Sequence, residues 1–245
     1  MLKTLRSLSR RQQEAEWLDD PSADPALIRK SLIYIRRINV LLRYTKATLS
    51  HLEAFSQSWP RGKTVHILDV ATGSADIPLA ILKWSRARGF DVRVTGVDLQ
   101  KSVIDTAKQT TDPHLSLAVA DALHLPFADG SFDYVITNMF LHHLDEDVVV
   151  SVFKEMSRVA SRGVIAADLI RCRGAYLGVV ALTLAANPMV RHDARVSVRQ
   201  AFNRDEILSL RDRAGIGFAC YYSHAGYRFV LAGEKPLPPR SLHES

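Results

Sequence analysis

The chain has 245 residues, of which 47% are hydrophobic and 24% charged, with a net charge of +6; this composition suits one globular domain with a full core. Two cysteines are too few for a disulfide framework or for a cysteine-held zinc or iron–sulfur cluster, so we expect a reducing, cytoplasmic compartment. No apolar run approaches the roughly 20 residues that span a bilayer, and we expect no transmembrane segment.

The first 64 residues are predicted to form a helical cap (domain 1–64). Asp24 can cap a helix that has Pro25 in its first turn. Apolar residues then recur on one face of that helix, at Ile28, Leu32, Ile35 and Leu42. This stretch holds the whole net charge of +6, which can attract nucleic acid, an anionic membrane or an anionic ligand. A solvated helix face is the simpler interpretation, and we expect no nucleic-acid partner.

From residue 65 onward, strand patterns and helix patterns alternate. Strands are predicted at 65–70, 91–98, 115–121, 132–138 and 163–169, and a strand pair turning at 224–226 closes the chain. Helices are predicted at 75–89, 101–110, 145–159 and 203–214. Strands separated by single helices imply a parallel, doubly wound sheet. We therefore predict an α/β fold with a Rossmann-like seven-stranded sheet and an antiparallel C-terminal hairpin in domain 65–235, then a flexible tail, 236–245.

Three of the predicted strands end in an acidic residue: Asp69, Asp98 and Asp121. Ligands of doubly wound sheets bind at the carboxyl ends of the strands. One such acid is commonly a solvated strand end, but three in consecutive strands indicate a binding site. A turn of small residues around Gly73 follows the first strand and leaves room for a ligand to approach the backbone.

These acids suit an adenosine group. Asp98, at the end of the second strand, can accept hydrogen bonds from both hydroxyls of a ribose. Asp121 can accept one from the exocyclic amine of adenine, with Ala122 and Leu123 against the base. A loop with a single glycine is poor for pyrophosphate, so the pattern favours an adenosine ligand that carries none.

The chain resembles the class I S-adenosylmethionine-dependent methyltransferases over residues 65–232. "LDVATGSAD" resembles the first motif of that family, "GVDLQ" the ribose motif, and "ADALHLPF" with "FDYVITNMFLHHLDE" the adenine motif and the segment after it. It is most similar to the branch of ubiquinone/menaquinone C-methyltransferases and related enzymes of small aromatic or polyketide-like acceptors. Ala71 and Ala75 replace two glycines of the first motif. A short-chain dehydrogenase is excluded, because no tyrosine has a lysine four residues later.

The resemblance implies S-adenosyl-L-methionine as the cofactor. We predict that its contacts come from the three strand-end acids, the turn after the first strand and the end of the fourth strand. The predicted cofactor-binding residues are Asp69, Ala71, Thr72, Gly73, Asp76, Asp98, Leu99, Asp121, Ala122 and Asn138.

His142 and His143 follow the fourth strand and are candidate general bases, His143 the stronger of the two. The alternative is that they pack structurally or cap the next helix. Adjacent histidines are expected to point in different directions, and no matching ligand cluster stands out, so we expect no metal site.

Residues 170–202 are predicted to form a lid over the acceptor, with an apolar helix followed by a polar turn. Such a pairing can enclose an apolar, partly anionic acceptor. His192 and Asp193 form a second candidate acid–base unit, or Asp193 pairs with an arginine in a surface turn. The predicted substrate contacts are His192, Asp193 and Arg199, with Asn39 from the N-terminal helix.

The sequence therefore predicts transfer of a methyl group to an oxygen or carbon atom of a small, apolar, aromatic or polyketide-derived molecule, as in secondary metabolism. Two alternatives remain open at this point: methylation of RNA or protein, and a non-catalytic scaffold that binds adenosine ligands. The oligomeric state is left open.

Overall fold

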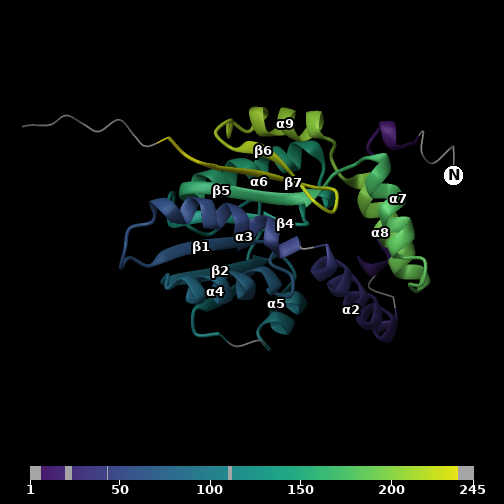
Figure 1. Cartoon of the computed structure of the whole chain (residues 1–245), viewed down its shortest axis with the longest axis horizontal. Helices are drawn as coiled ribbons and strands as arrows, with labels where there is room; N and C mark the ends of the chain where they lie inside the picture. Colours follow the sequence, from purple (N-terminus) through teal and green to yellow (C-terminus); the bar gives the residue numbers. More distant parts are fainter. Residues whose placement is uncertain (1–6, 20–23, 43, 110–111, 237–245) are drawn as a thin grey trace, which may run out of the picture.

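A seven-stranded sheet forms the centre of the protein (Figure 1). The computed structural model describes residues 7–19, 24–42, 44–109 and 112–236. Its strands are β1 (Val65–Val70), β2 (Val92–Asp98), β3 (Leu115–Val119), β4 (Phe132–Asn138), β5 (Ala160–Leu169), β6 (Cys220–His224) and β7 (Arg228–Glu234). Their order is β3-β2-β1-β4-β5-β7-β6, and only the pairings of β7 are antiparallel. The predicted α/β fold with an antiparallel C-terminal hairpin is confirmed.

The direction of chain progress through the sheet reverses between β1 and β4. From β1 the chain runs outward to β2 and β3, and it then returns to the other side of β1 to add β4 and β5. The connections on the two sides diverge at this switch point, so a crevice opens beyond the carboxyl ends of β1 and β4. Asp69 near the end of β1 and Asn138 at the end of β4 therefore flank the expected ligand position.

Helices cover both faces of the sheet. Helices α3 (Tyr44–Phe55) and α4 (Asp76–Arg88) pack on one face, and α6 (Glu146–Val159) and α9 (Arg204–Arg213) pack on the other. The short α5 (Lys101–Ala107) lies beside β2 and β3. Each face has its own apolar core, which buries both sides of β1 and explains its nearly continuous run of apolar residues.

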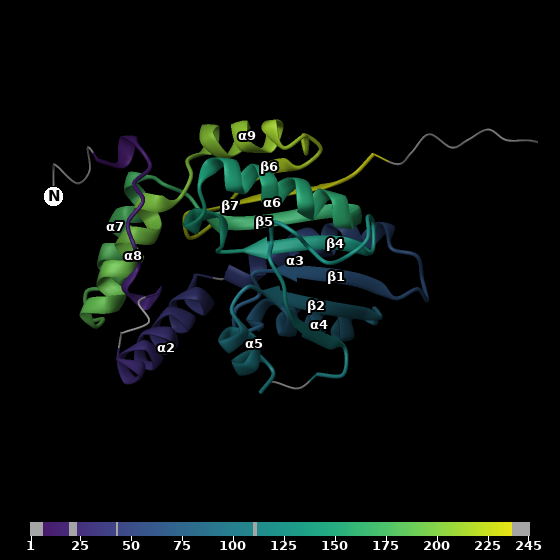
Figure 2. The same ribbon diagram turned by 180° about the vertical axis from the view of Figure 1, so that it is seen from behind.

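Three further helices, α2 (Pro25–Leu41), α7 (Arg173–Leu182) and α8 (Pro188–Gln200), stand together beyond the carboxyl ends of the strands (Figures 1 and 2). One prediction was wrong here, because the polar turn expected after the apolar helix is helix α8. Asn187 caps α8 by accepting a hydrogen bond from the Val190 amide at 3.0 Å, and the proline at its first position suits a helix start.

The N-terminal residues run along α8 as an extended strap, residues 10–16, between two single-turn helices, η1 (Ser7–Ser9) and η2 (Trp17–Asp19). Arg11 donates to the carbonyl oxygens of Gln200 and His142, at 2.5 and 2.7 Å. The strap is thereby fixed against η4 (Leu141–His143), the turn that follows β4. Another single-turn helix, η3 (Ser56–Ser58), ends α3.

Two remaining expectations concern the termini and the membrane. Residues 237–245 of the predicted tail lie outside the described residues. Within the described part of the chain, no helix combines the length and the apolar character needed to cross a membrane.

Candidate functional site

The loops after β1, β2 and β3 meet at the carboxyl edge of the sheet, where hydrogen bonds of Asp98 connect them. Its Oδ2 accepts a hydrogen bond from the Gly73 amide at 3.1 Å, and its backbone oxygen accepts one from the Ala120 amide at 3.0 Å. Asp121, in the third loop, accepts from the Leu123 amide at 2.9 Å. The structure thus brings the predicted ribose and adenine contacts together around one crevice.

The loop after β1 has the backbone of a glycine-rich turn although two of its glycine positions hold alanine. Ala71, Gly73 and Ala75 all have left-handed φ angles, of 58°, 55° and 60°. Only glycine adopts this region without strain. A Cβ built on Gly73 would meet no heavy atom within 4 Å, so the space above this residue is open to a ligand.

Asp69 supports the loop from beneath rather than facing the crevice. It is buried, and its Oδ2 accepts a hydrogen bond from the Thr72 hydroxyl at 2.7 Å. Burial raises the pKa of the Asp69 carboxyl to about 7, although the Thr72 hydroxyl and the nearby Asn138 amide act in the opposite direction. The hydrogen-bonded pair of Asp69 and Thr72 can lie against β2 because residue 96 of that strand is a glycine. A Cβ atom on Gly96 would lie 2.7 Å from Thr72 Oγ1.

Asn138 is buried at the switch point. Its Oδ1 accepts a hydrogen bond from the Thr48 hydroxyl of α3 at 2.5 Å. Its Nδ2 faces the Asp69 carboxyl closely enough to lower the pKa of that group, but no acceptor among the described residues meets hydrogen-bonding geometry with it. A buried amide donor with only a poorly placed acceptor is under-satisfied, so this group fits a site that a ligand completes. Thr48 was missed, because no pattern connects α3 to this edge.

The other predicted cofactor residues lie around the same loops. Asp76 is the first residue of α4, and its Oδ2 accepts from the Ser74 hydroxyl at 3.0 Å. Leu99 follows β2 and is exposed, and Ala122 is partly buried next to Asp121.

A cavity of about 230 Å³ lies between this edge of the sheet and helices α2, α7 and α8. Most of its wall is apolar, from Ile35, Ile38, Leu42, Met139, Leu169, Val179, Leu182 and Val190. Its polar groups include Glu16, His142, His143, Asp193 and Arg228. An apolar chamber with a few converging polar groups is the usual form of a small-molecule site.

His142 is held by Asp168, a residue that the sequence reasoning missed. The His142 Nδ1 lies 2.7 Å from Asp168 Oδ1, and the His142 amide donates to Asp168 Oδ2 at 3.0 Å. Burial lowers the pKa of His142, but the charge and the hydrogen bond of Asp168 together leave it raised. Burial acts to raise the pKa of Asp168, but the charge and hydrogen bond of His142, with the amides of Leu169 and His142, leave it lowered. Asp168 could have been predicted from the sequence, because it lies near the end of its strand, β5, as the other three acids lie near the ends of theirs.

His143 lies beside His142 rather than pointing away from it. The two ring centroids are 4.1 Å apart. His143 is exposed as a residue, but the desolvation of its ring beside His142, with the charge of His142, lowers its pKa to about 4. One ligand atom from each of these histidines and one from Glu16 lie within 4.8 Å of one another. The expectation that adjacent histidines diverge, with no ligand cluster, was therefore wrong.

Two of the predicted substrate contacts, Asp193 and His192, bind η2 and the N-terminal strap. Asp193 accepts from the Trp17 and Leu18 amides at 2.8 and 3.0 Å, although it also lines the cavity. His192 lies between Asp193 and Glu14, at 2.9 and 3.2 Å, and its ring stacks on Trp17. His192 thus has Asp193 of α8 on its Nδ1, as the predicted acid–base unit requires, and Glu14 of the strap on its Nε2; its role as an acid–base residue stays a prediction.

The remaining two predicted contacts are Arg199 and Asn39. Arg199 forms an ion pair with Glu14 of the strap and is not among the residues that line the cavity. Asn39 belongs to α2, but its side chain lies outside the described residues.

Arg228 was also missed, and nothing in the sequence distinguishes it. It stands at the start of β7, only 3% exposed, with its guanidinium carbon 4.3 Å from the centre of the Tyr44 ring. Burial lowers the pKa of Arg228. It places a cation at the cavity wall.

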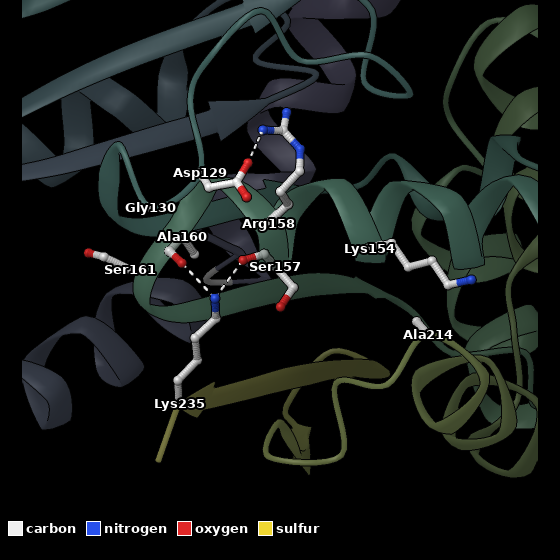
Figure 3. Close-up of a pocket in the computed structure, with 9 residues that line it drawn as sticks. All are labelled: Asp129, Gly130, Lys154, Ser157, Arg158, Ala160, Ser161, Ala214 and Lys235. Carbon is white, nitrogen blue, oxygen red and sulfur yellow. Dashed lines mark hydrogen bonds and ion pairs between the residues drawn. The ribbon is translucent and has the colours of Figure 1, made fainter. Parts of the chain in front are cut away.

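A second hollow, of about 620 Å³, lies near the start of β5, away from the strand-end crevice (Figure 3). Lys235 donates there to the carbonyl oxygens of Ser157 and Ala160, at 2.6 and 2.7 Å. Arg158 contacts Asp129 Oδ1 at 2.7 Å. These cations anchor the end of β7 and a surface turn, so the hollow has a structural explanation.

Comparison with known proteins agrees with this geometry. Residues 67–163 match the family described as a methyltransferase domain. The chain is 38% identical over 98 residues to a demethylmenaquinone methyltransferase of Staphylococcus epidermidis, an alignment covering 39% of each chain. It is 39% identical over 87 residues to a ubiquinone/menaquinone biosynthesis C-methyltransferase, UbiE, of Rickettsia felis, covering 34% of this chain and 35% of the other. The alignments thus span about two fifths or less of these curated relatives.

Solved structures extend the similarity of the fold to most of the chain. The magnesium protoporphyrin IX methyltransferase of Synechocystis, solved with bound S-adenosylhomocysteine, covers 89% of this chain and 91% of its own with a TM-score of 0.57 and 13% identity. The plantazolicin methyltransferase BpumL covers 81% and 74% with a TM-score of 0.64 and 13% identity. Residues 67–163 are thus a methyltransferase domain, within a chain that has the class I S-adenosylmethionine-dependent methyltransferase fold and is similar to the UbiE-like branch.

Proposed function

We propose that the protein is an S-adenosylmethionine-dependent methyltransferase that acts on a small, largely apolar acceptor. The observation that carries this proposal is the edge of the sheet at which Asp98 accepts from the Gly73 amide, with open space above Gly73, together with an apolar cavity that Met139, after β4, lines at the same edge. The relatives named above support it.

The residues of the crevice fit the cofactor. Asp98 would bind the ribose, Asp121 with Ala122 the adenine, and the Gly73 turn with Asn138 the amino-acid portion. The Asn138 Nδ2 donor, buried and without a hydrogen bond among the described residues, supports a ligand with an acceptor oxygen there.

When bound, the cofactor supplies a methyl group on a sulfonium, which is already activated for in-line displacement. The chain's own task is then to orient the acceptor and exclude water. The apolar wall of the cavity excludes water. The His142–Asp168 pair places an imidazole at that wall, where it can take a proton from an acceptor hydroxyl.

The size and lining of the cavity indicate the acceptor class. A cavity of about 150 Å³ lined by apolar side chains holds benzene, so about 230 Å³ suits an acceptor group of one or two rings. Arg228 would attract an anionic oxygen of that group. We propose an aromatic or polyketide-derived acceptor, methylated on an oxygen or on a carbon activated by it, in cytoplasmic secondary metabolism. The helices α2, α7 and α8 act as its lid.

A transfer assay tests the proposal. The full chain is incubated with S-adenosylmethionine labelled in its methyl group and a panel of phenols, quinols and polyketide-like enols. We expect label in at least one acceptor, and loss of transfer in Asp98→Ala. Binding of the cofactor without transfer to any member would favour the scaffold alternative, and absence of cofactor binding would reject the function.

A further inference from the structure

We propose that Glu16, His142 and His143 form a binding site for one divalent transition-metal ion at the wall of the acceptor cavity. The strap brings Glu16 to the two histidines of η4, although more than a hundred residues separate them in sequence. Two imidazoles and a carboxylate are the ligand types that Zn²⁺, Fe²⁺ and Co²⁺ accept.

The geometry is close to that of a bound ion. The three ligand atoms lie within 4.8 Å of one another, whereas a tetrahedral ion with bonds near 2.1 Å needs separations of about 3.4 Å. Closing that difference requires shifts of about 1 Å in side chains. Glu16 belongs to the extended strap, and its Oε1 accepts a hydrogen bond from the Ser197 hydroxyl at 2.5 Å, so a bound ion would share this carboxylate with Ser197 or displace that contact.

Asp168 prepares His142 as a ligand. Its carboxylate accepts from the ring Nδ1 at 2.7 Å and from the amides of His142 and Leu169 at 3.0 and 2.7 Å. The ring proton is therefore held on Nδ1, which leaves the lone pair on Nε2. Metal-binding histidines are regularly oriented in this way by a carboxylate on the other ring nitrogen.

The charges near the cavity also accommodate a cation. Three carboxylates lie there: Glu16 and Asp193 line the cavity, and Asp168 stands behind His142. Arg228 at the wall and Arg11, which donates to the His142 carbonyl, supply the opposing positive charges. Carboxylates therefore outnumber arginines around the neutral imidazoles, which favours binding of a divalent ion.

Three protein ligands leave further coordination positions, and the cavity adjoins the three ligand side chains. An ion there would bind an oxygen of the acceptor and lower the pKa of its hydroxyl. In the metal-free protein, His142 Nε2 is the proton acceptor described above; in the loaded protein it is a metal ligand. Metal binding requires neither cofactor nor acceptor, so this inference stands or falls separately from the methyltransferase function.

The test is titration of the untagged, chelator-treated full chain with Co²⁺, followed by its visible d–d absorption. We expect one ion per chain. His143→Ala and Glu16→Gln should weaken binding at least about tenfold, and Asp168→Asn by about 10- to 100-fold through the orientation of His142. His66→Ala, on an exposed position of β1, and Glu14→Gln, on the same strap, are the matched controls and should bind as wild type does.

A second measurement follows Trp17, the neighbour of Glu16, by fluorescence during the same titration. Its signal should change at one equivalent of metal in the wild type and not in Glu16→Gln. The inference is overturned if no stoichiometric binding occurs, or if Glu14→Gln loses binding as Glu16→Gln does. It is equally overturned if binding survives in His143→Ala and disappears in His51→Ala, since the ion would then lie at the His51–His224 pair.

Discussion

Replacing Gly73 by alanine should affect the affinity for the cofactor much more than the stability of the fold. Gly73 has a φ of 55°, and a Cβ there meets no heavy atom within 4 Å. The methyl group itself therefore clashes with nothing in the folded chain. The remaining cost is the left-handed backbone, about 1 kcal/mol for alanine, part of which is offset by the lower entropy of the unfolded chain.

This cost predicts a fall in the midpoint of thermal unfolding of no more than about 2–4 °C for a chain of this size. The effect on cofactor binding should be larger, because the added methyl group occupies the space above the loop that we assign to the ligand. We expect the affinity for S-adenosylhomocysteine, measured by isothermal titration calorimetry, to fall at least about tenfold, which corresponds to about 1.4 kcal/mol.

Gly62→Ala is the control for this experiment. Gly62 lies in the turn before β1 with a φ of 74°, and a Cβ there also meets nothing within 4 Å. It should show a similar loss of stability with unchanged binding. Equal affinities of Gly73→Ala and the wild type would refute our placement of the cofactor.

Three further changes test other parts of the site. Asp98→Asn should weaken S-adenosylhomocysteine binding by about 10- to 100-fold, because hydrogen bonds to a charged group contribute about 1.5–3 kcal/mol. Calorimetry measures this affinity, and a change below about threefold would contradict the assignment of Asp98 to the ribose. Ala71→Gly removes the backbone strain of an alanine in the left-handed conformation and should raise the midpoint of thermal unfolding by up to about 4 °C. A lower midpoint would show that Ala71 is not strained. Between about pH 4 and pH 7 native Asp69 retains a proton that the unfolded chain has lost, so its contribution to stability falls as the pH rises. Asp69→Asn should therefore become more stable relative to wild type at about pH 8 than at about pH 5, by at most about 3 kcal/mol in urea unfolding. A difference independent of pH would refute this.

The sheet was predictable because each strand carries its own signal. Apolar runs such as 65–70 and 132–138 are bounded by turn residues, and the alternation with helices fixes a parallel order. The strand-end acids were predictable for the same reason, since parallel strands deliver their ends to one edge. The motifs then identified the family despite the alanines at 71 and 75, whose backbone still adopts the left-handed conformation of glycine.

The acceptor side was harder to predict, because its contacts join segments distant in sequence. His192 and Asp193 contact each other as a local acid–base pair would, but they also bind η2 and the strap, some 175 residues earlier, which no local pattern shows. The polar residues of α8 were taken for a turn, because the apolar face of that helix is short and becomes meaningful only when buried against the cavity. The His142–Asp168 contact likewise depends on the pairing of β4 with β5.

The central claim is that an adenosine ligand lies across the ends of β1, β2 and β3, and a crystal structure with S-adenosylhomocysteine tests it most directly. Our account predicts the ribose hydroxyls within hydrogen-bonding distance of Asp98, the adenine beside Asp121 and the sulfur near the cavity that His142 lines. A ligand bound elsewhere, or a crevice closed by side chains at saturating ligand, would contradict it.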